Sequence, residues 1–386
     1  LILAAYQKWG EACADHLLGD FAFAIHDPRS NTLFCARDHF GLRPFYYHYS
    51  KTRLVFAYDA RLILSDQHVP YAISEARIAD FLVPELEWID YTSTFYNDVF
   101  RLPPGHTLIV NKAGPRVSEY WQPEPGPEPG PMSDNDWRDG FLEVFTRAID
   151  ERLRSAPGPT GSMLSGGMDS GSVAAVASSL LQGGGESLRT WSAVQNESVE
   201  CEESRRIRAT LRHIGVAGTT IEPDSISDLD GELVESIEEP FDAEYLFLKA
   251  IYLSAAGEGM QALLDGGGGD VLLNEGSYLT RLLRQGRLPT AFRELRKGPR
   301  FWGGSVTKEI LHCSAAALVP EFAKSRVRPY RLRAAARRFI NASLINPEFA
   351  QSVDIESRCA VSYTHLRAHE TNESISYAVF CLKKGG

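Results

Sequence analysis

The sequence lacks several features that would indicate particular classes of protein. None of its six cysteines forms a CxxC pair, and their spacing suggests neither a zinc site nor a disulfide framework, so a reducing cytoplasm is the expected location. No apolar run approaches the roughly 18 residues that a membrane-spanning helix needs. The sequence has fewer basic than acidic residues, with 40 Lys and Arg against 50 Asp and Glu, so its formal net charge is −10. Since a general nucleic-acid binder is usually basic, we expect neither nucleic acid nor a membrane as partner.

The 386 residues have an ordinary globular composition and are numerous enough for two domains. Residues 1–121 contain short aromatic and β-branched segments separated by turns, which predicts layered antiparallel β-structure. Residues 122–133 include the string QPEPGPEPGP. Proline stiffens the chain and cannot donate to a β-ladder, so this segment is predicted to be a linker between domains.

Residues 134–360 read as a second domain of the α/β class. Short strands alternate with helices up to Asp270, which predicts a parallel sheet covered on both faces, and the pattern then becomes helical. The first helix after the linker carries an apolar stripe at helical spacing that we expect to pack in the core. The stripe consists of Trp137, Phe141, Phe145, Ile149 and Leu153.

The string GSMLSGGMDS, residues 161–170, falls between a predicted strand and a predicted helix. Adjacent glycines let a backbone approach an anion closely, and the start of the next helix presents free N–H groups and a positive dipole end. Ser165 and Ser170 add hydroxyl donors. Asp169 would repel a phosphate but can ligate a Mg²⁺ ion that bridges phosphates. The lysine of a Walker loop is absent. A plain glycine turn is the alternative, but the whole SGGxDS string in this position favours a phosphate site.

This string resembles the PP-loop of the N-type ATP pyrophosphatases, which cleave ATP between the α- and β-phosphates. Residues 17–27 (LLGDFAFAIHD) and 36–47 (ARDHFGLRPFYY) resemble the second half of a class II glutamine amidotransferase domain, an N-terminal-nucleophile fold. The two domains in this order are typical of the glutamine-hydrolysing asparagine synthetase family. The resemblance covers residues 1 to about 300 and implies a cytoplasmic ATP- and magnesium-dependent carbon–nitrogen ligase of asparagine biosynthesis.

The resemblance also implies the ligands of the nucleotide, while it assigns no catalytic residue here. A second glycine cluster, residues 264–270 (LDGGGGD), resembles the family's SGEGxDE loop. Strand core is the alternative for Leu164 and Val194, and a helix N-cap is the alternative for Asp270. The implied ATP ligands are Leu164, Ser165, Gly166, Gly167, Asp169, Ser170, Val194, Asp265 and Gly266, and the implied Mg²⁺ ligands are Asp169 and Asp270.

Two departures from the family pattern affect the substrate. Gly267 and Val271 replace acidic residues of the family's loop. The resemblance implies aspartate, with ammonia from glutamine, as the substrate pair. Gly267 weakens that assignment, so another carboxylate or a lactam-forming reaction is the alternative. A non-catalytic ATP-binding or scaffolding remnant is a further alternative. PP-loop enzymes that modify tRNA are disfavoured, because they lack the amidotransferase half. A homodimer is compatible with the resemblance.

Both ends depart from the family as well. The family's nucleophile is an N-terminal cysteine, whereas this chain begins with Leu1, and Cys13 and Cys35 read as core residues. We therefore expect a chain truncated at both ends that does not hydrolyse glutamine as given. Residues 361–386 change character abruptly and are expected to be a non-native tail that replaces the family's last helical segment with its late catalytic lysine.

Overall fold

The computed structural model describes residues 1–83, 90–123, 132–194, 201–222, 246–269, 286–297 and 343–355, with a few isolated positions besides. The chain divides into two compact units, and every strand named below lies in the unit that holds residues 1–81 and 90–271. The other unit holds α12 (Leu288–Lys297) and α16 (Pro347–Ser352), which agree with the helical pattern expected after Asp270. Most of the predicted linker and the whole predicted tail lie outside the described residues.

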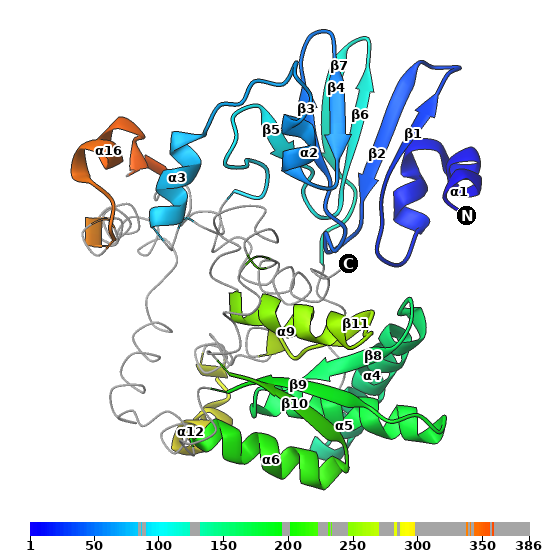
Figure 1. The fold of residues 1–386 in the computed structure, drawn as a ribbon, viewed down its shortest axis with the longest axis vertical. Coiled ribbons are helices and arrows are strands. Elements are labelled where there is room, and N and C mark those ends of the chain that lie inside the picture. The colour runs from blue at the N-terminus through cyan, green and yellow to red at the C-terminus, as the bar shows by residue number, and fades with distance from the viewer. Residues whose placement is uncertain are drawn as a thin grey trace. The chain divides into compact units, whose positions relative to one another are not determined.

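The N-terminal residues form an antiparallel sheet in the strand order β1-β2-β6-β7 (Figure 1). One face packs against the helix α1 (Ile2–Trp9) and the 3-10 helix η1 (Gly10–His16). Cys13, Phe34 and Ile109 are buried between the sheet and these helices. The strands are β1 (Ala22–Asp27), β2 (Thr32–Arg37), β6 (His106–Asn111) and β7 (Gly114–Glu119).

A second antiparallel sheet, in the order β4-β3-β5, packs on the other face of the first. Cys35 and Leu108 of the first sheet share a buried cluster with Phe45 and Leu102, which flank strands of the second. The predicted layering is therefore confirmed. The short strand β5 and the helices α2 and α3 were not predicted. The elements are β3 (Tyr46–Tyr49), β4 (Leu54–Ala57), β5 (Val99–Arg101), α2 (Ala60–Leu64) and α3 (Glu75–Leu82).

A buried ionic turn follows β2 and joins the two sheets. The Arg37 guanidinium donates to the carbonyls of Gly41, Arg43 and Leu102 at 2.7, 2.8 and 2.6 Å. The Asp38 carboxylate accepts from the N–H of Arg43 at 2.9 Å. Burial lowers the pKa of Arg37 to about 10, which still leaves the side chain charged at neutral pH. These hydrogen bonds give the Arg37–Asp38 pair a structural role in this turn of the N-terminal half.

The second half of the same unit is built on a parallel sheet in the order β10-β9-β8-β11. A buried cluster containing Ile149, Val173 and Ile207 joins one face to α4, α5 and α6. A second cluster, which contains Trp191 and Ile251, joins the other face to α9. The predicted sheet with helices on both faces is confirmed (Figure 1). The elements are β8 (Thr160–Met163), β9 (Arg189–Ala193), β10 (Ala217–Ile221), β11 (Ala262–Leu264), α4 (Asp134–Ser155), α5 (Met168–Gly183), α6 (Glu202–Ile214) and α9 (Leu246–Gly257).

The apolar stripe of α4 is only partly buried, so its expected burial is corrected in part. Ser133 caps the helix through a capping box with Asp136. Ile149 is buried in the core, whereas Trp137 and Phe141 each keep 53% of their surface exposed. Helical periodicity identifies the apolar face but not the length over which that face meets a neighbour. Among the described residues, no helix has both the length and the apolar character that crossing a membrane requires.

Side chains of the core pack directly against Gly161 in β8, where any other residue would place its Cβ atom. The substitution Gly161→Ala should therefore destabilise the protein. A methyl group there would collide with the ring of the fully buried Trp191 and lie 2.9 Å from Cδ2 of Leu263. Overpacking of this kind costs about 1–3 kcal/mol, which urea unfolding would measure. The control is Gly183→Ala in α5, where the methyl group meets nothing within 4 Å. Equal unfolding midpoints for the two variants would contradict the packing.

The cysteines should differ in reactivity. Burial raises the pKa of Cys13 and raises that of Cys35 to about 12, whereas hydrogen bonds from Ser204 lower the pKa of Cys201 at the start of α6. Since the thiolate is the reactive form, iodoacetamide near pH 8 should modify Cys201 first and Cys35 last among the three. Mass spectrometry of timed samples would measure the order. Modification of Cys35 in the folded protein as fast as in urea would contradict its burial.

Candidate functional site

The predicted phosphate loop lies at the carboxyl end of β8, where the chain leaves the parallel sheet. Leu164 extends the ladder by one residue, because its N–H donates to the carbonyl of Trp191 at 2.9 Å. Ser165 is exposed, and α5 begins at Met168. Ligands of open α/β sheets bind outside the carboxyl ends of the strands. The loop therefore occupies the edge of the sheet where a ligand is expected.

Two serines close this loop on itself. The N–H of Ser165 donates to Oγ of Ser170 at 3.1 Å, and the two hydroxyl oxygens are 2.9 Å apart. The N–H of Gly167 donates to Oγ of Ser165 at 3.4 Å. Because Ser170 is buried in the first turn of α5, these contacts tie the exposed part of the loop to the helix. The loop is thus held in one shape by its own side chains.

The start of α5 is suited to an anion. Its N-cap is Gly167, which has no side chain to cap the helix. The first N–H groups of an α-helix have no acceptor within the helix, and the dipole places partial positive charge beside them. Asp169 lies in this first turn and is half-buried. A bound phosphate near this carboxylate would need a cation between the two negative groups.

Gly166 has a backbone conformation that glycine favours, with φ +78°. A methyl group there would also lie 2.8 Å from the carbonyl oxygen of Glu203, in the first turn of α6. The loop therefore packs against two helices at once. The contribution of α6 was not predicted. The order of elements could have indicated it, because α6 follows β9, the strand next to β8.

The second glycine cluster follows β11, the strand that pairs with β8 on its other side. The Asp265 carboxylate accepts from the N–H of Gly267 at 2.8 Å. Burial raises the pKa of Asp265, while hydrogen bonds from the Gly267 amide and the Tyr252 side chain oppose that rise. The N–H of Gly269 donates to the carbonyl of Gly266 at 3.3 Å. The cluster is therefore a compact turn held at its base by Asp265.

The two glycine-containing loops touch each other. A methyl group at Gly266 would lie 2.5 Å from the backbone nitrogen of Ser170, and one at Gly269 would lie 2.5 Å from Cγ of Asp169. Both positions therefore bring the second loop against the first turn of α5. Of the predicted site residues, those from Ser165 to Ser170 and the turn that begins at Asp265 are brought together at one edge of the sheet.

Two of the remaining predicted ligands are buried, and the third lies outside the described residues. Leu164 and Val194 are both buried in the hydrophobic core, at the ends of β8 and β9. This placement accords with the alternative interpretation as strand core, and contact of either side chain with a nucleotide stays a prediction. Asp270 and Val271 lie outside the described residues.

The described side chains are better suited to a metal ion that is shared with a bound phosphate than to a metal ion held by protein ligands alone. The described residues contain no group of three or more His, Cys, Asp or Glu side chains that could hold a metal ion. Asp169 supplies one carboxylate beside the glycine cradle. Mg²⁺ commonly takes one or two carboxylates together with substrate phosphates and water. Among the described residues, Asp169 could therefore hold such an ion only together with further ligands, such as phosphates and water.

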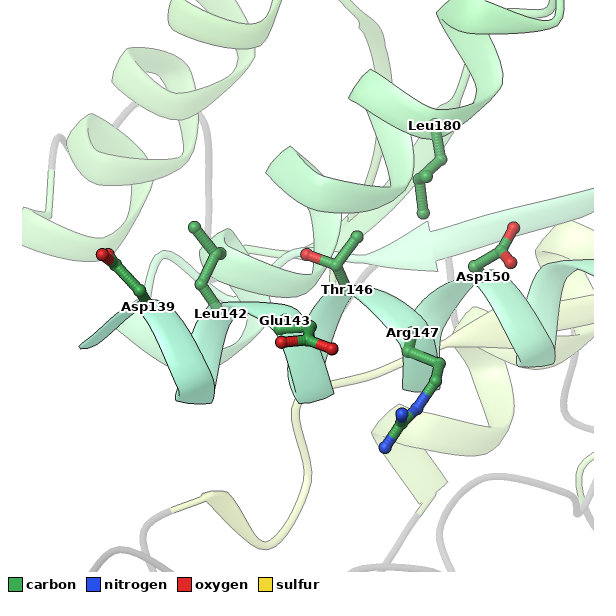
Figure 2. A pocket seen from close by; sticks show the side chains of 7 residues that line it. All are labelled: Asp139, Leu142, Glu143, Thr146, Arg147, Asp150 and Leu180. Atoms are coloured by element: carbon green, nitrogen blue, oxygen red, sulfur yellow. The ribbon is translucent and has the colours of Figure 1, made fainter. Parts of the chain in front are cut away.

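A shallow pocket of about 530 Å³ lies elsewhere, along α4 beside α5 (Figure 2). No residue of the two glycine loops lines it. Its wall carries mixed charge, and Figure 2 shows the α4 side chains spread along that helix rather than converging on a point, with Leu180 contributed by α5. The pocket therefore does not compete with the loops as the candidate site. It is lined by Asp139, Leu142, Glu143, Thr146, Arg147, Asp150 and Leu180.

Comparison with known families divides the chain in two. The family model described as a glutamine amidotransferase domain matches residues 1–121. The family model described as asparagine synthase matches residues 140–374, which is more than half of the chain. The second match contains both glycine loops.

Curated relatives share moderate identity with the chain. Asparagine synthetase [glutamine-hydrolyzing] 3 of Bacillus subtilis is 30% identical over 51% of this chain and 32% of its own length. Amidase chry2 of Gibberella zeae is 28% identical over 56% of this chain and 33% of its own length. The putative asparagine synthetase [glutamine-hydrolyzing] 2 of Methanocaldococcus jannaschii is 30% identical over 46% of this chain and 34% of its own length. The chain thus spans about a third of the length of each. With both domains present in this order, the chain belongs to the glutamine-hydrolysing asparagine synthetase family.

Proposed function

We propose that the chain binds Mg·ATP at the two glycine loops and transfers AMP to a carboxylate, which ammonia then converts to an amide. The observation that carries the proposal is the open first turn of α5 behind the Gly166–Gly167 cradle, with Asp169 beside it. Pyrophosphate is the leaving group of such a reaction. Its charge must be neutralised for the α-phosphorus to be attacked.

Different groups of the loop would bind the phosphates and the cation. The amides and dipole of α5 attract the phosphates, and the exposed hydroxyl of Ser165 can donate a hydrogen bond to them while it accepts one from Ser170. Asp169 would help to hold Mg²⁺, whose two positive charges would offset the negative charge of the phosphates. Because the serines already fix the loop through each other, little reorganisation is needed when the ligand arrives.

The acceptor carboxylate is proposed to be aspartate, with glutamine as the source of ammonia. The names of the bacterial and archaeal relatives support this choice, while the fungal relative is named an amidase. Gly267 is exposed and offers only its backbone to a substrate, and its N–H already holds Asp265. A different carboxylate, or an internal amine that closes a lactam, is therefore the second candidate for the acceptor pair.

The two thiols within the residues that match the amidotransferase domain, Cys13 and Cys35, bear on the ammonia supply. Cys13 and Cys35 are fully buried, and burial raises the pKa of both. A nucleophilic cysteine needs an accessible thiolate. Neither residue is suited to attack glutamine, so the proposed ligase activity should be assayed with ammonium salts as the nitrogen source.

Removal of the Asp169 carboxylate should abolish tight binding of Mg·ATP. Titration calorimetry should detect binding to the unaltered chain and lose most of it in Asp169→Ala, because the bridging cation loses its protein ligand. The matched control is Asp134→Ala, which removes an exposed acid from the first turn of α4 and should leave binding unchanged. Absence of binding to the unaltered chain would instead support a structural remnant.

The acceptor can be identified by pyrophosphate release. The chain should release pyrophosphate from Mg·ATP when a carboxylate substrate is added together with ammonium chloride. Release stimulated by aspartate alone, from a panel of amino acids and dicarboxylates, would support asparagine formation. Release with another carboxylate would support the second candidate, and release of orthophosphate in place of pyrophosphate would contradict the proposed chemistry.

A further inference from the structure

We propose that Gly266 and Gly269 are positioning residues: their lack of a side chain lets the second loop hold the Asp169 carboxylate and the start of α5 in place. The inference rests on the proposed Mg·ATP site, but it concerns a contact that exists without any ligand. The two glycines touch different atoms of the first loop. Each should therefore affect a different part of the binding.

Gly269 lies against the carboxylate itself. A methyl group at this position would lie 2.5 Å from both Cγ and Oδ2 of Asp169 and 3.1 Å from its Cβ. Carbon and oxygen atoms in van der Waals contact are more than 3 Å apart, so the carboxylate would have to rotate or move. A ligand for Mg²⁺ must keep near-ideal geometry, because this ion tolerates little distortion. Gly269 thus fixes where the carboxylate can meet a cation.

Gly266 lies against the backbone of α5 instead. A methyl group there would lie 2.5 Å from the nitrogen of Ser170 and 2.7 Å from the carbonyl carbon of Asp169. These are atoms of the first helical turn, whose amides are proposed to hold the phosphates. Backbone atoms cannot rotate away as a side chain can. A substitution at Gly266 should therefore shift the amide donors and not the carboxylate alone.

Backbone conformation does not account for glycine at these two positions. Within this turn, Gly268 has a positive φ of +82°, which itself favours glycine. Neither Gly266 nor Gly269 is among the glycines with positive φ. An alanine could adopt their backbone angles, and what excludes it is the closeness of Asp169 and Ser170. Glycine is needed at these two positions because there is no room for a side chain, and not because the backbone adopts an unusual conformation.

The unfolding free energy provides a test without nucleotide. Gly269→Ala should lower the urea midpoint of the unaltered chain but have little effect in an Asp169→Ala background, because Cγ and Oδ2 are then absent. If the single variant does not fold, the double variant should fold better than it does. Equal losses in both backgrounds, or a double variant that folds no better, would overturn the proposal.

The magnesium dependence of ATP binding tests the consequence. In Gly269→Ala, the MgCl₂ concentration that gives half-maximal ATP binding should rise about 10- to 100-fold, as for other changes in the surroundings of a metal ligand. ATP binding in EDTA should match that of the unaltered chain. Gly266→Ala should weaken ATP binding both with MgCl₂ and in EDTA. Gly183→Ala, whose methyl group meets nothing within 4 Å, is the control for both measurements.

The outcomes separate this inference from the proposed function. Failure of the unaltered chain to bind Mg·ATP would contradict the proposed function, and the urea experiment would still decide whether Gly269 holds Asp169. Normal Mg·ATP binding by the unaltered chain, with wild-type magnesium dependence in Gly269→Ala, would contradict the inference alone. Equal weakening with MgCl₂ and in EDTA in Gly269→Ala would also contradict it.

Discussion

The parallel pairing of β8 with β11 is the constraint on which the candidate site depends. It aligns Ser162 with Leu264, and Oγ of Ser162 donates to the carbonyl of Leu264, 102 residues further along the chain. Both strands end at the same edge of the sheet, so the loops that follow them must meet. The small residues of those loops then allow contact between backbones, and Asp169 is held at the point of contact. The packing of the loops follows from this one adjacency, and the proposed phosphate and cation sites depend on it.

Most of the fold was predictable because its signals are local. Apolar strands alternating with helices predicted the parallel sheet, and the short aromatic strands predicted the layered N-terminal half, which the structure confirms. The misses have physical reasons. The strand β5 has three residues, too few to show a period, and its pairing with β3 is set by the tertiary fold. The stripe on α4 revealed an apolar face, but the exposure of Trp137 depends on which neighbours reach it.

The site was predictable as a motif and not as a set of contacts. The string at residues 161–170 identified the strand–loop–helix unit, and the role of its serines as donors to a phosphate stays a prediction. The hydrogen bond from Tyr252 to Asp265, and the packing of Gly166 against Glu203, join elements whose separation in sequence carries no local signal. Family resemblance assigned Gly266 to the nucleotide and marked Gly267 as a departure, but it gave no physical reason for any glycine of the second loop. The structure gives a reason for three of them, because Gly268 has a positive φ, and a methyl group at Gly266 or Gly269 would collide with Asp169 or Ser170.

The central claim is that a carboxylate oxygen of the substrate attacks the α-phosphorus of ATP at this edge of the sheet. The most direct test follows the oxygen atom. The chain would be incubated with Mg·ATP, ammonium chloride and a substrate labelled with ¹⁸O in the reacting carboxylate, and the products would be analysed by ³¹P NMR and mass spectrometry. Adenylation followed by amide formation predicts AMP that carries one ¹⁸O atom. Unlabelled AMP, or label found in orthophosphate beside ADP, would contradict the account.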